Sequence, residues 1–206
     1  ASSFLETLQS NGVVGCLKHF PGLGASEVDS HEELPTVGIS LAEFQAVDLA
    51  PYRHLISGGS VEAVMVAHAA YPNLGLQETG QDGKLLPASL SSNIVSKLLR
   101  QELGFDGLVL TDDLEMGAIL KNYGIGDASL MAIDAGHDMV CICAGVDSIR
   151  TAHQTIRKAV EDGSLDEKRI DESVNRILKL KSKLSSPQDL DLENIASLSR
   201  RTVELN

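Results

Sequence analysis

No apolar run in the sequence approaches the roughly 20 residues that a membrane-spanning helix requires. Basic residues are also few: 17 lysines and arginines stand against 29 aspartates and glutamates, which gives a formal net charge of −12. Nucleic-acid binding depends on a basic face, so this charge argues against such a partner. We therefore expect neither a membrane span nor a nucleic-acid ligand.

Cysteine is scarce as well. The three cysteines, Cys16, Cys141 and Cys143, cannot all pair with one another. A zinc site would need further ligands at metal-binding spacing, and none lies near them in the sequence. We therefore expect no metal site and interpret the three as buried free thiols. Reduced thiols favour a cytoplasmic location slightly, and a secreted or periplasmic location stays open.

Four short apolar runs alternate with longer amphipathic stretches. The 206 residues are 43% hydrophobic and 22% charged, a balance typical of a globular protein. Each run is rich in Val, Ile, Leu, Met or Cys, as expected of a strand buried on both faces. The runs cover residues 13–17, 63–67, 107–110 and 139–144. Alternation of this kind predicts an α/β fold with a parallel sheet.

Five amphipathic stretches have the period and the ends of helices. Ser40 and Glu43 have the spacing of a capping box before the first stretch, and glycines follow several of the others. The stretches cover residues 44–56, 94–103, 127–136, 147–162 and 166–184. We expect one unit over residues 1–186, followed by a polar tail or helix over residues 187–206.

Two adjacent carboxylates, Asp112 and Asp113, follow the third apolar run. A carboxylate fixed at a strand end suits a nucleophile, because small errors of placement greatly reduce the reaction rate. Spacing alone, however, favours helix capping, in which the side chain accepts hydrogen bonds from exposed backbone N–H groups. Because the two residues are neighbours, we expect only one of them to face a pocket.

The long loop after the first run contains Asp29 and His31. Histidine titrates near neutrality, and a nearby carboxylate can fix its tautomer and raise its basicity, as a general acid/base requires. Gly22 and Gly24 near the start of the loop would let it swing over a bound substrate. The alternative, which spacing alone favours, is a solvent-exposed histidine in an acidic loop.

Three further polar residues, Lys18, His19 and His68, stand at predicted strand ends. Each is a candidate for hydrogen bonding to sugar hydroxyl groups. A structural or orienting role suits each of them as well, and Lys18 could pair with a buried carboxylate. A Schiff base at Lys18 would require a carbonyl substrate, and nothing in the sequence favours it.

An ordered series of short motifs runs through the chain. The series is KHFPGLG (18–24), DSH (29–31), LP (34–35), VMVAH (64–68), PASLS (87–91), LLR (98–100), GFDG (104–107), TDDLEM (111–116) and AGHD (135–138). It resembles the motifs of glycoside hydrolase family 3, and the DSH element indicates the β-N-acetylhexosaminidase branch. Each motif is moderately specific, whereas the ordered series is highly specific.

The resemblance implies a (β/α)₈ TIM barrel, of which this chain would supply the C-terminal half, about four βα units. It implies a retaining glycosidase that acts on terminal, non-reducing β-linked N-acetylglucosamine in peptidoglycan fragments or chitooligosaccharides, with no cofactor. Asp112 would be the nucleophile, and His31, oriented by Asp29, would be the general acid/base. Lys18, His19 and His68 would bind the substrate.

Several positions depart from the family's usual pattern. The family commonly has His where this chain has Leu23, and Asp-Thr or Asn-Thr where it has Ala25 and Ser26. The family's β-glucosidases usually carry Trp after the nucleophile. Here that position is Asp113 and the chain has no tryptophan, which favours the hexosaminidase branch over β-glucosidase-type specificity.

Half a barrel would expose two parallel edge strands and an open core face. We therefore expect either a fragment or a chain that associates with a missing N-terminal half or a second copy. A non-catalytic, sugar-binding remnant of such an enzyme is the remaining alternative.

Overall fold

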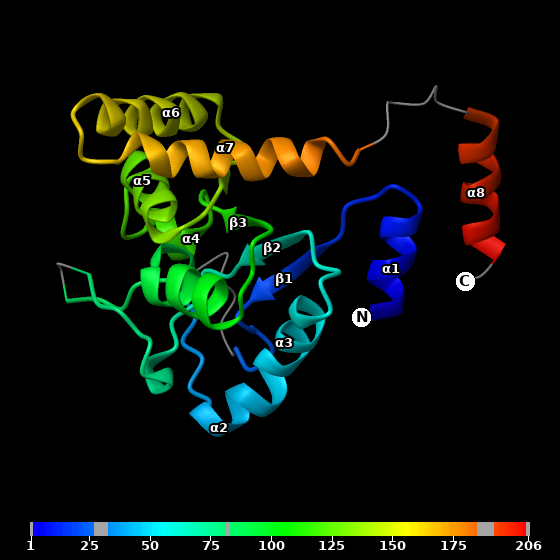
Figure 1. Ribbon diagram of the computed structural model, residues 1–206, viewed down its shortest axis with the longest axis horizontal. Coiled ribbons are helices and arrows are strands. Elements are labelled where there is room, and N and C mark those ends of the chain that lie inside the picture. The colour runs from blue at the N-terminus through cyan, green and yellow to red at the C-terminus, as the bar shows by residue number, and fades with distance from the viewer. Residues whose placement is uncertain (1, 27–32, 81–82, 185–191, 205–206) are drawn as a thin grey trace.

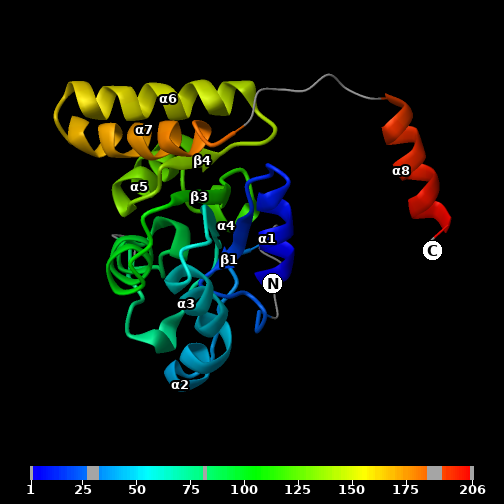
Figure 2. The ribbon, with the colours of Figure 1, turned by 45° about the vertical axis from the view of Figure 1, so that its right-hand side comes forward.

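Four parallel strands form one sheet in the order β1-β2-β3-β4. The first three are labelled in Figure 1, and β4 is labelled in Figure 2. The computed structural model describes residues 2–26, 33–80, 83–184 and 192–204. The strands are β1 (Cys16–Phe20), β2 (Ala63–Val66), β3 (Leu108–Asp113) and β4 (Met139–Cys141). Each is joined to the next by a segment that contains helix, so the predicted parallel α/β fold is confirmed.

The first strand starts later than the predicted run at residues 13–17. Residues 11–13 instead close the end of α1 (Ser2–Ser10), where the backbone N–H of Val13 donates to Leu8 O at 3.0 Å. Val13 is exposed. Val13 is therefore part of the turn that ends α1, and it is not part of the sheet.

All five predicted helical stretches are helical. The first comprises α2 (Leu41–Glu43), the π-helical η1 (Phe44–Asp48) and α3 (Leu49–Ser57), and Ser40 Oγ accepts the N–H of Glu43 at its start. The second is the π-helix η4 (Asn93–Glu102). The others are α5 (Ile125–Ala135), α6 (Val146–Glu161) and α7 (Glu167–Lys181). Shorter helical segments are η2 (Pro72–Leu74), η3 (Ala88–Leu90) and α4 (Gly117–Leu120).

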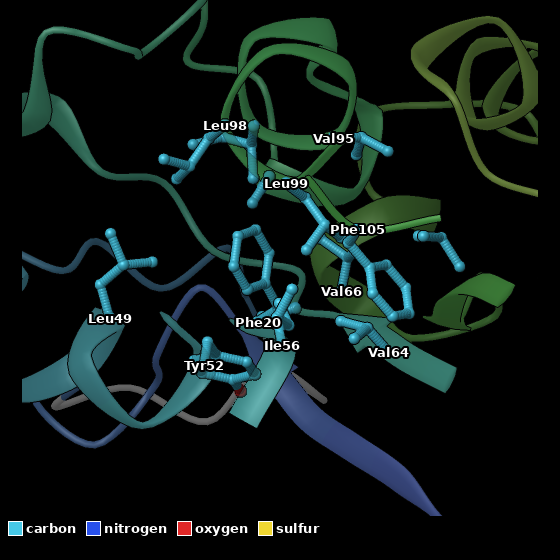
Figure 3. Packing of buried hydrophobic residues seen from close by; sticks show 14 of the residues in the cluster. Phe20, Leu49, Tyr52, Ile56, Val64, Val66, Val95, Leu98, Leu99 and Phe105 are labelled. Atoms are coloured by element: carbon cyan, nitrogen blue, oxygen red, sulfur yellow. The ribbon is translucent and has the colours of Figure 1, made fainter. Parts of the chain in front are cut away.

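One face of the sheet packs against α3 and η4 to form the main core (Figure 3). Val64 and Val66 of β2 are fully buried there, as are Phe20 at the end of β1 and Leu99 of η4. The ring of Phe20 meets Tyr52 edge to face at 5.1 Å. Burial of these side chains is worth about 1.5–3 kcal/mol each and holds the helices against the strands.

The opposite face of the sheet is less covered. Along β3, Val109 and Thr111 are buried, whereas Leu108 and Leu110, which point to the other face, are only half-buried. This alternation differs from the continuous burial that a closed, filled barrel gives its strands.

The prediction that the cysteines are buried is wrong, because none of the three is fully buried. Cys16 and Cys143 are exposed, and Cys141 is half-buried. Val140 and Ile142 pack against the helices, so the cysteines that alternate with them face away from the helices. The sequence run is apolar enough for burial on both faces, but β1 and β4 are the outer strands of the sheet.

Helices α6 and α7 lie side by side beyond β4, and α8 (Leu192–Glu204) lies apart from the other elements (Figure 2). The predicted tail is thus helical over residues 192–204. Across the described ranges, no helix is both long and apolar enough to cross a membrane.

A buried ion cluster joins the amino ends of β3 and β4 to η4 and α7. The Asp138 carboxylate has no exposed surface and accepts hydrogen bonds from Arg100 Nη2 at 2.6 Å and Arg176 Nη1 at 3.2 Å. It also accepts the Ser173 hydroxyl and the Val109 N–H. The carboxylate therefore fixes the geometry of four elements at once.

Asp138→Asn should lower the free energy of unfolding by about 3–5 kcal/mol, because it leaves buried arginines without their counter-charge. Asp106→Asn is the matched control, since the 76% exposed Asp106 also pairs with Arg176 and should contribute less than about 1 kcal/mol. Urea unfolding of both variants measures the difference. Equal losses would contradict the assigned role of Asp138.

Acid should destabilise the protein through His137. The ring is fully buried, Nδ1 donates to Ala132 O at 3.0 Å, and Nε2 has no partner among the described residues. Burial lowers the pKa of His137 to about 3. The unfolded chain therefore binds this proton below pH 6.5 while the folded protein does not, and stability falls as pH falls from 6.5 towards 3.

The contribution of His137 to this loss should reach about 1.4 kcal/mol per pH unit. His137→Asn keeps a donor for Ala132 O but cannot titrate. Its free energy of unfolding, measured from pH 7 to pH 4, should decline less steeply than that of the wild type. Parallel curves would show that His137 is not responsible.

Candidate active site

The residues that follow the strands meet at one edge of the sheet, because all four strands point the same way. Val66 pairs with Thr111, and Asp113 pairs with Cys141. The register therefore brings the segments after β2, β3 and β4 together, with the end of β1 beside that of β2.

Asp112 lies at this edge with 20% of its side chain exposed. Its Oδ1 accepts the backbone N–H of Asp113 at 2.9 Å. Its Oδ2 lies 3.6 Å from His19 Nε2, which is longer than a hydrogen bond. One carboxylate oxygen is thus held by the backbone, while the other borders a half-buried imidazole.

Asp113 has a different environment. Its Oδ1 accepts the N–H groups of Glu115 at 3.1 Å and of Cys143 at 3.3 Å. The side chain thereby links the loop after β3 to the loop after β4. Both neighbouring carboxylates therefore accept backbone N–H groups, and the expectation that only one of them faces a pocket stays a prediction.

Lys18 and His19 belong to the last part of β1, and both the Lys18–His19 and Phe20–Pro21 peptide bonds are cis. Burial lowers the pKa of His19, and the nearby Asp112 carboxylate only partly opposes this effect. The ring is therefore neutral near pH 7. Lys18 is exposed and next to it.

His68 follows β2 and is only 1% exposed. Its Nδ1 lies 2.6 Å from Ser89 Oγ and its Nε2 lies 3.0 Å from the backbone oxygen of Asp113. Both ring nitrogens are thus engaged within the protein. Of the two roles that the sequence left open, this geometry favours orientation of other residues over contact with substrate.

Asp29 and His31 lie outside the described residues. The described end of their loop begins at Glu33, which is 3.6 Å from Lys121 Nζ. A cleft of about 510 Å³ opens between this segment and the loops after β2 and β3, and Leu34, Lys84 and Asn122 contribute to its lining. The cleft lies at the same end of the sheet as Asp112.

Sequence reasoning assigned no role to several residues that shape this edge. The Glu115 carboxylate accepts the N–H groups of Ala144 at 2.6 Å and Gly145 at 3.1 Å. The Tyr71 hydroxyl donates to Gly22 O at 2.7 Å and anchors the start of the loop after β1. Glu115 stands inside the TDDLEM motif, which was the available signal. Tyr71 had none, because its partner is 49 residues away.

Within the described ranges, no group of three or more His, Cys, Asp or Glu side chains is arranged to hold a metal ion. The chemistry available at this edge is that of carboxylates, imidazoles and hydrogen-bond donors. A partly exposed carboxylate beside a neutral imidazole suits nucleophilic attack and proton transfer.

Comparisons with known proteins find relatives named β-hexosaminidase. The chain is 32% identical over 189 residues to β-hexosaminidase A of Pseudoalteromonas piscicida, covering 87% of this chain and 32% of that protein. It is 36% identical over 157 residues to a β-hexosaminidase of Neisseria meningitidis serogroup C, covering 76% of this chain and 41% of that protein. The chain therefore spans about a third to two fifths of the length of these relatives.

A solved glycoside hydrolase family 3 β-N-acetylglucosaminidase from Paenibacillus sp. FPU-7 superimposes with a TM-score of 0.82 at 40% identity. The match covers 91% of this chain and 35% of that one. Residues 1–180 also match the model of the glycosyl hydrolase family 3 N-terminal domain. The chain belongs to glycoside hydrolase family 3.

Proposed function

We propose that this chain carries the catalytic residues of a retaining glycosidase that releases terminal β-linked N-acetylglucosamine. The observation that carries the proposal is the environment of Asp112. Its carboxylate stands at a strand end, one oxygen held by the Asp113 N–H and the other directed to the side of His19. The names of the family 3 relatives, β-hexosaminidase and β-N-acetylglucosaminidase, support the choice of sugar.

In the first step, Asp112 Oδ2 attacks the anomeric carbon and the bond from that carbon to the leaving oxygen breaks. His31 donates a proton to this oxygen, so the aglycone departs as a neutral alcohol. The imidazolium thereby becomes a neutral base and not a second anion beside Asp112. We assign Asp29 the task of holding the His31 ring in the required tautomer.

In the second step, the neutral His31 removes a proton from water, and the water oxygen bonds to the anomeric carbon. The ester bond to Asp112 breaks and the carboxylate is restored. Two inversions at one carbon give net retention of configuration. No cofactor enters either step.

We assign Lys18 and His19 to the binding of sugar hydroxyl groups. His19 is half-buried and neutral, so it can donate or accept a hydrogen bond without forming an ion pair with Asp112. Lys18 supplies an exposed donor beside it. The cleft lined by Leu34, Lys84 and Asn122, at the same end of the sheet, suits the part of the substrate beyond the scissile bond.

Asp112→Asn should reduce kcat on an aryl N-acetyl-β-glucosaminide by at least about a thousandfold, because the amide is a poor nucleophile. Asp113→Asn is the matched control. Its oxygen can still accept from Glu115 and Cys143, so kcat should fall less than about tenfold. Mass spectrometry of wild-type protein quenched during turnover should locate the covalent sugar on Asp112.

Full turnover by Asp112→Asn would refute the assignment. Wild-type protein that binds N-acetylglucosamine without turning over the aryl glycoside would instead support the sugar-binding remnant. Faster turnover of the aryl β-glucoside than of its N-acetylglucosamine counterpart would indicate β-glucosidase-type specificity.

His31→Ala should affect glycosides unequally. A nitrophenolate leaves without help from an acid, whereas an alkyl or sugar alkoxide needs protonation. The variant should therefore lose at least about tenfold more activity on a chitooligosaccharide than on the nitrophenyl glycoside. Parallel losses on both substrates, measured as kcat/KM, would remove His31 from the acid/base role.

A further inference from the structure

The imidazole of His68 is fully engaged within the protein beside the candidate nucleophile. It is 1% exposed, and Ser89, its partner at Nδ1, has no exposed surface. Its partner at Nε2 is the backbone oxygen of Asp113, the residue after Asp112. His68 follows β2, Ser89 belongs to η3, and Asp113 is the last residue of β3.

The partners determine the tautomer. A backbone carbonyl only accepts hydrogen bonds, so Nε2 carries the proton and donates it to Asp113 O. In a neutral ring Nδ1 is then an acceptor, and Ser89 Oγ–H donates to it. Burial lowers the pKa of His68, which keeps the ring in this neutral state near pH 7.

The Asp113 backbone is held on both of its polar groups. Its carbonyl accepts from His68, and its N–H donates to Asp112 Oδ1 at 2.9 Å. Towards β4, the next residue, Leu114, donates its N–H to Cys141 O at 2.9 Å. The 113–114 peptide unit is therefore held by both of its polar groups, between the segments after β2 and β4. It adjoins, through the Asp113 Cα atom, the 112–113 peptide unit whose N–H contacts the Asp112 carboxylate.

We propose that His68 is a positioning residue for the nucleophile: its Nε2–H holds the Asp113 carbonyl and so fixes the backbone at the Asp113 Cα atom, which keeps the adjoining Asp113 N–H on Asp112 Oδ1 and leaves Oδ2 for attack. The inference rests on the proposed role of Asp112. Loss of the Nε2–H donor would let the 113–114 peptide unit rotate. The backbone at Asp113 would shift with it, which would displace the Asp113 N–H and turn the Asp112 carboxylate away from the anomeric carbon. Such an error affects the chemical step more than substrate binding.

Two conservative variants separate this role from simple packing. In His68→Gln, the amide nitrogen reaches the position of Nε2 and can donate to Asp113 O. In His68→Asn, the shorter amide reaches only the position of Nδ1, so Ser89 keeps a partner and Asp113 O loses its donor. Both variants place a neutral polar group in the same buried site.

We expect His68→Asn to lower kcat on the aryl N-acetyl-β-glucosaminide by about 10- to 100-fold with KM changed less than about threefold. His68→Gln should recover kcat to within about fivefold of the wild type. Thermal unfolding of both variants shows whether they are folded. Equal kcat for the two folded variants would overturn the inference, and so would a raised KM with unchanged kcat, which is the mark of direct substrate contact.

Should His68→Asn fail to fold, His68→Gln decides alone: a folded Gln variant with kcat reduced a hundredfold contradicts the role of Nε2–H. Asp112→Asn in the same assay separates failure of the positioning role of His68 from failure of the proposed function. If it is inactive while His68→Asn is fully active, only the positioning role fails. If Asp112→Asn is itself active, the proposed function fails.

Discussion

The parallel pairing of β2 with β3 is the constraint on which the candidate site depends. Its register sets Val66 beside Thr111, so the residues that follow the two strands emerge together at one edge of the sheet. His68 thereby meets the backbone of Asp113 although 45 residues separate them. Side chains alternate between the faces of a strand, so a slip of one residue would turn Asp112 towards the helices and bury it. The hydrophobic packing that enforces this register is therefore also what places the carboxylate.

The two ends of the sheet differ in how far they bury a carboxylate. At the amino end, Asp138 is fully buried and surrounded by donors, among them Arg100 and Arg176, so the charge is compensated and the local geometry is rigid. At the carboxyl end, Asp112 keeps 20% of its side chain exposed and only one oxygen is held by the backbone. A carboxylate as enclosed as Asp138 would be unreachable by a substrate. The amino end of the sheet thus stabilises the fold, while the carboxyl end keeps a charged side chain accessible, as in other parallel α/β folds.

The elements and the location of Asp112 could be predicted because their signals are local. Apolar runs, capping residues and glycines lie within a few positions of the strand or helix that they mark. The hydrogen bonds of His68 could not be predicted, since its partners are 21 and 45 residues away and share no periodicity with it. The exposure of Cys143 was missed for a related reason. An apolar run indicates a strand, but whether both of its faces are covered depends on the strand's place in the sheet.

Two neutral imidazoles lie near Asp112, since burial lowers the pKa of both His19 and His68. A protonated ring at His19 would form an ion pair with the carboxylate and stabilise it before any reaction. In the proposed mechanism, these neutral neighbours leave the Asp112 carboxylate to interact with the positive charge that develops on the sugar in the oxocarbenium-like transition state. An interaction that strengthens only in the transition state raises kcat, whereas one already complete in the ground state does not. Under the proposed mechanism, burial of the two histidines favours the role of Asp112, because neither ring forms an ion pair with its carboxylate before the substrate reacts.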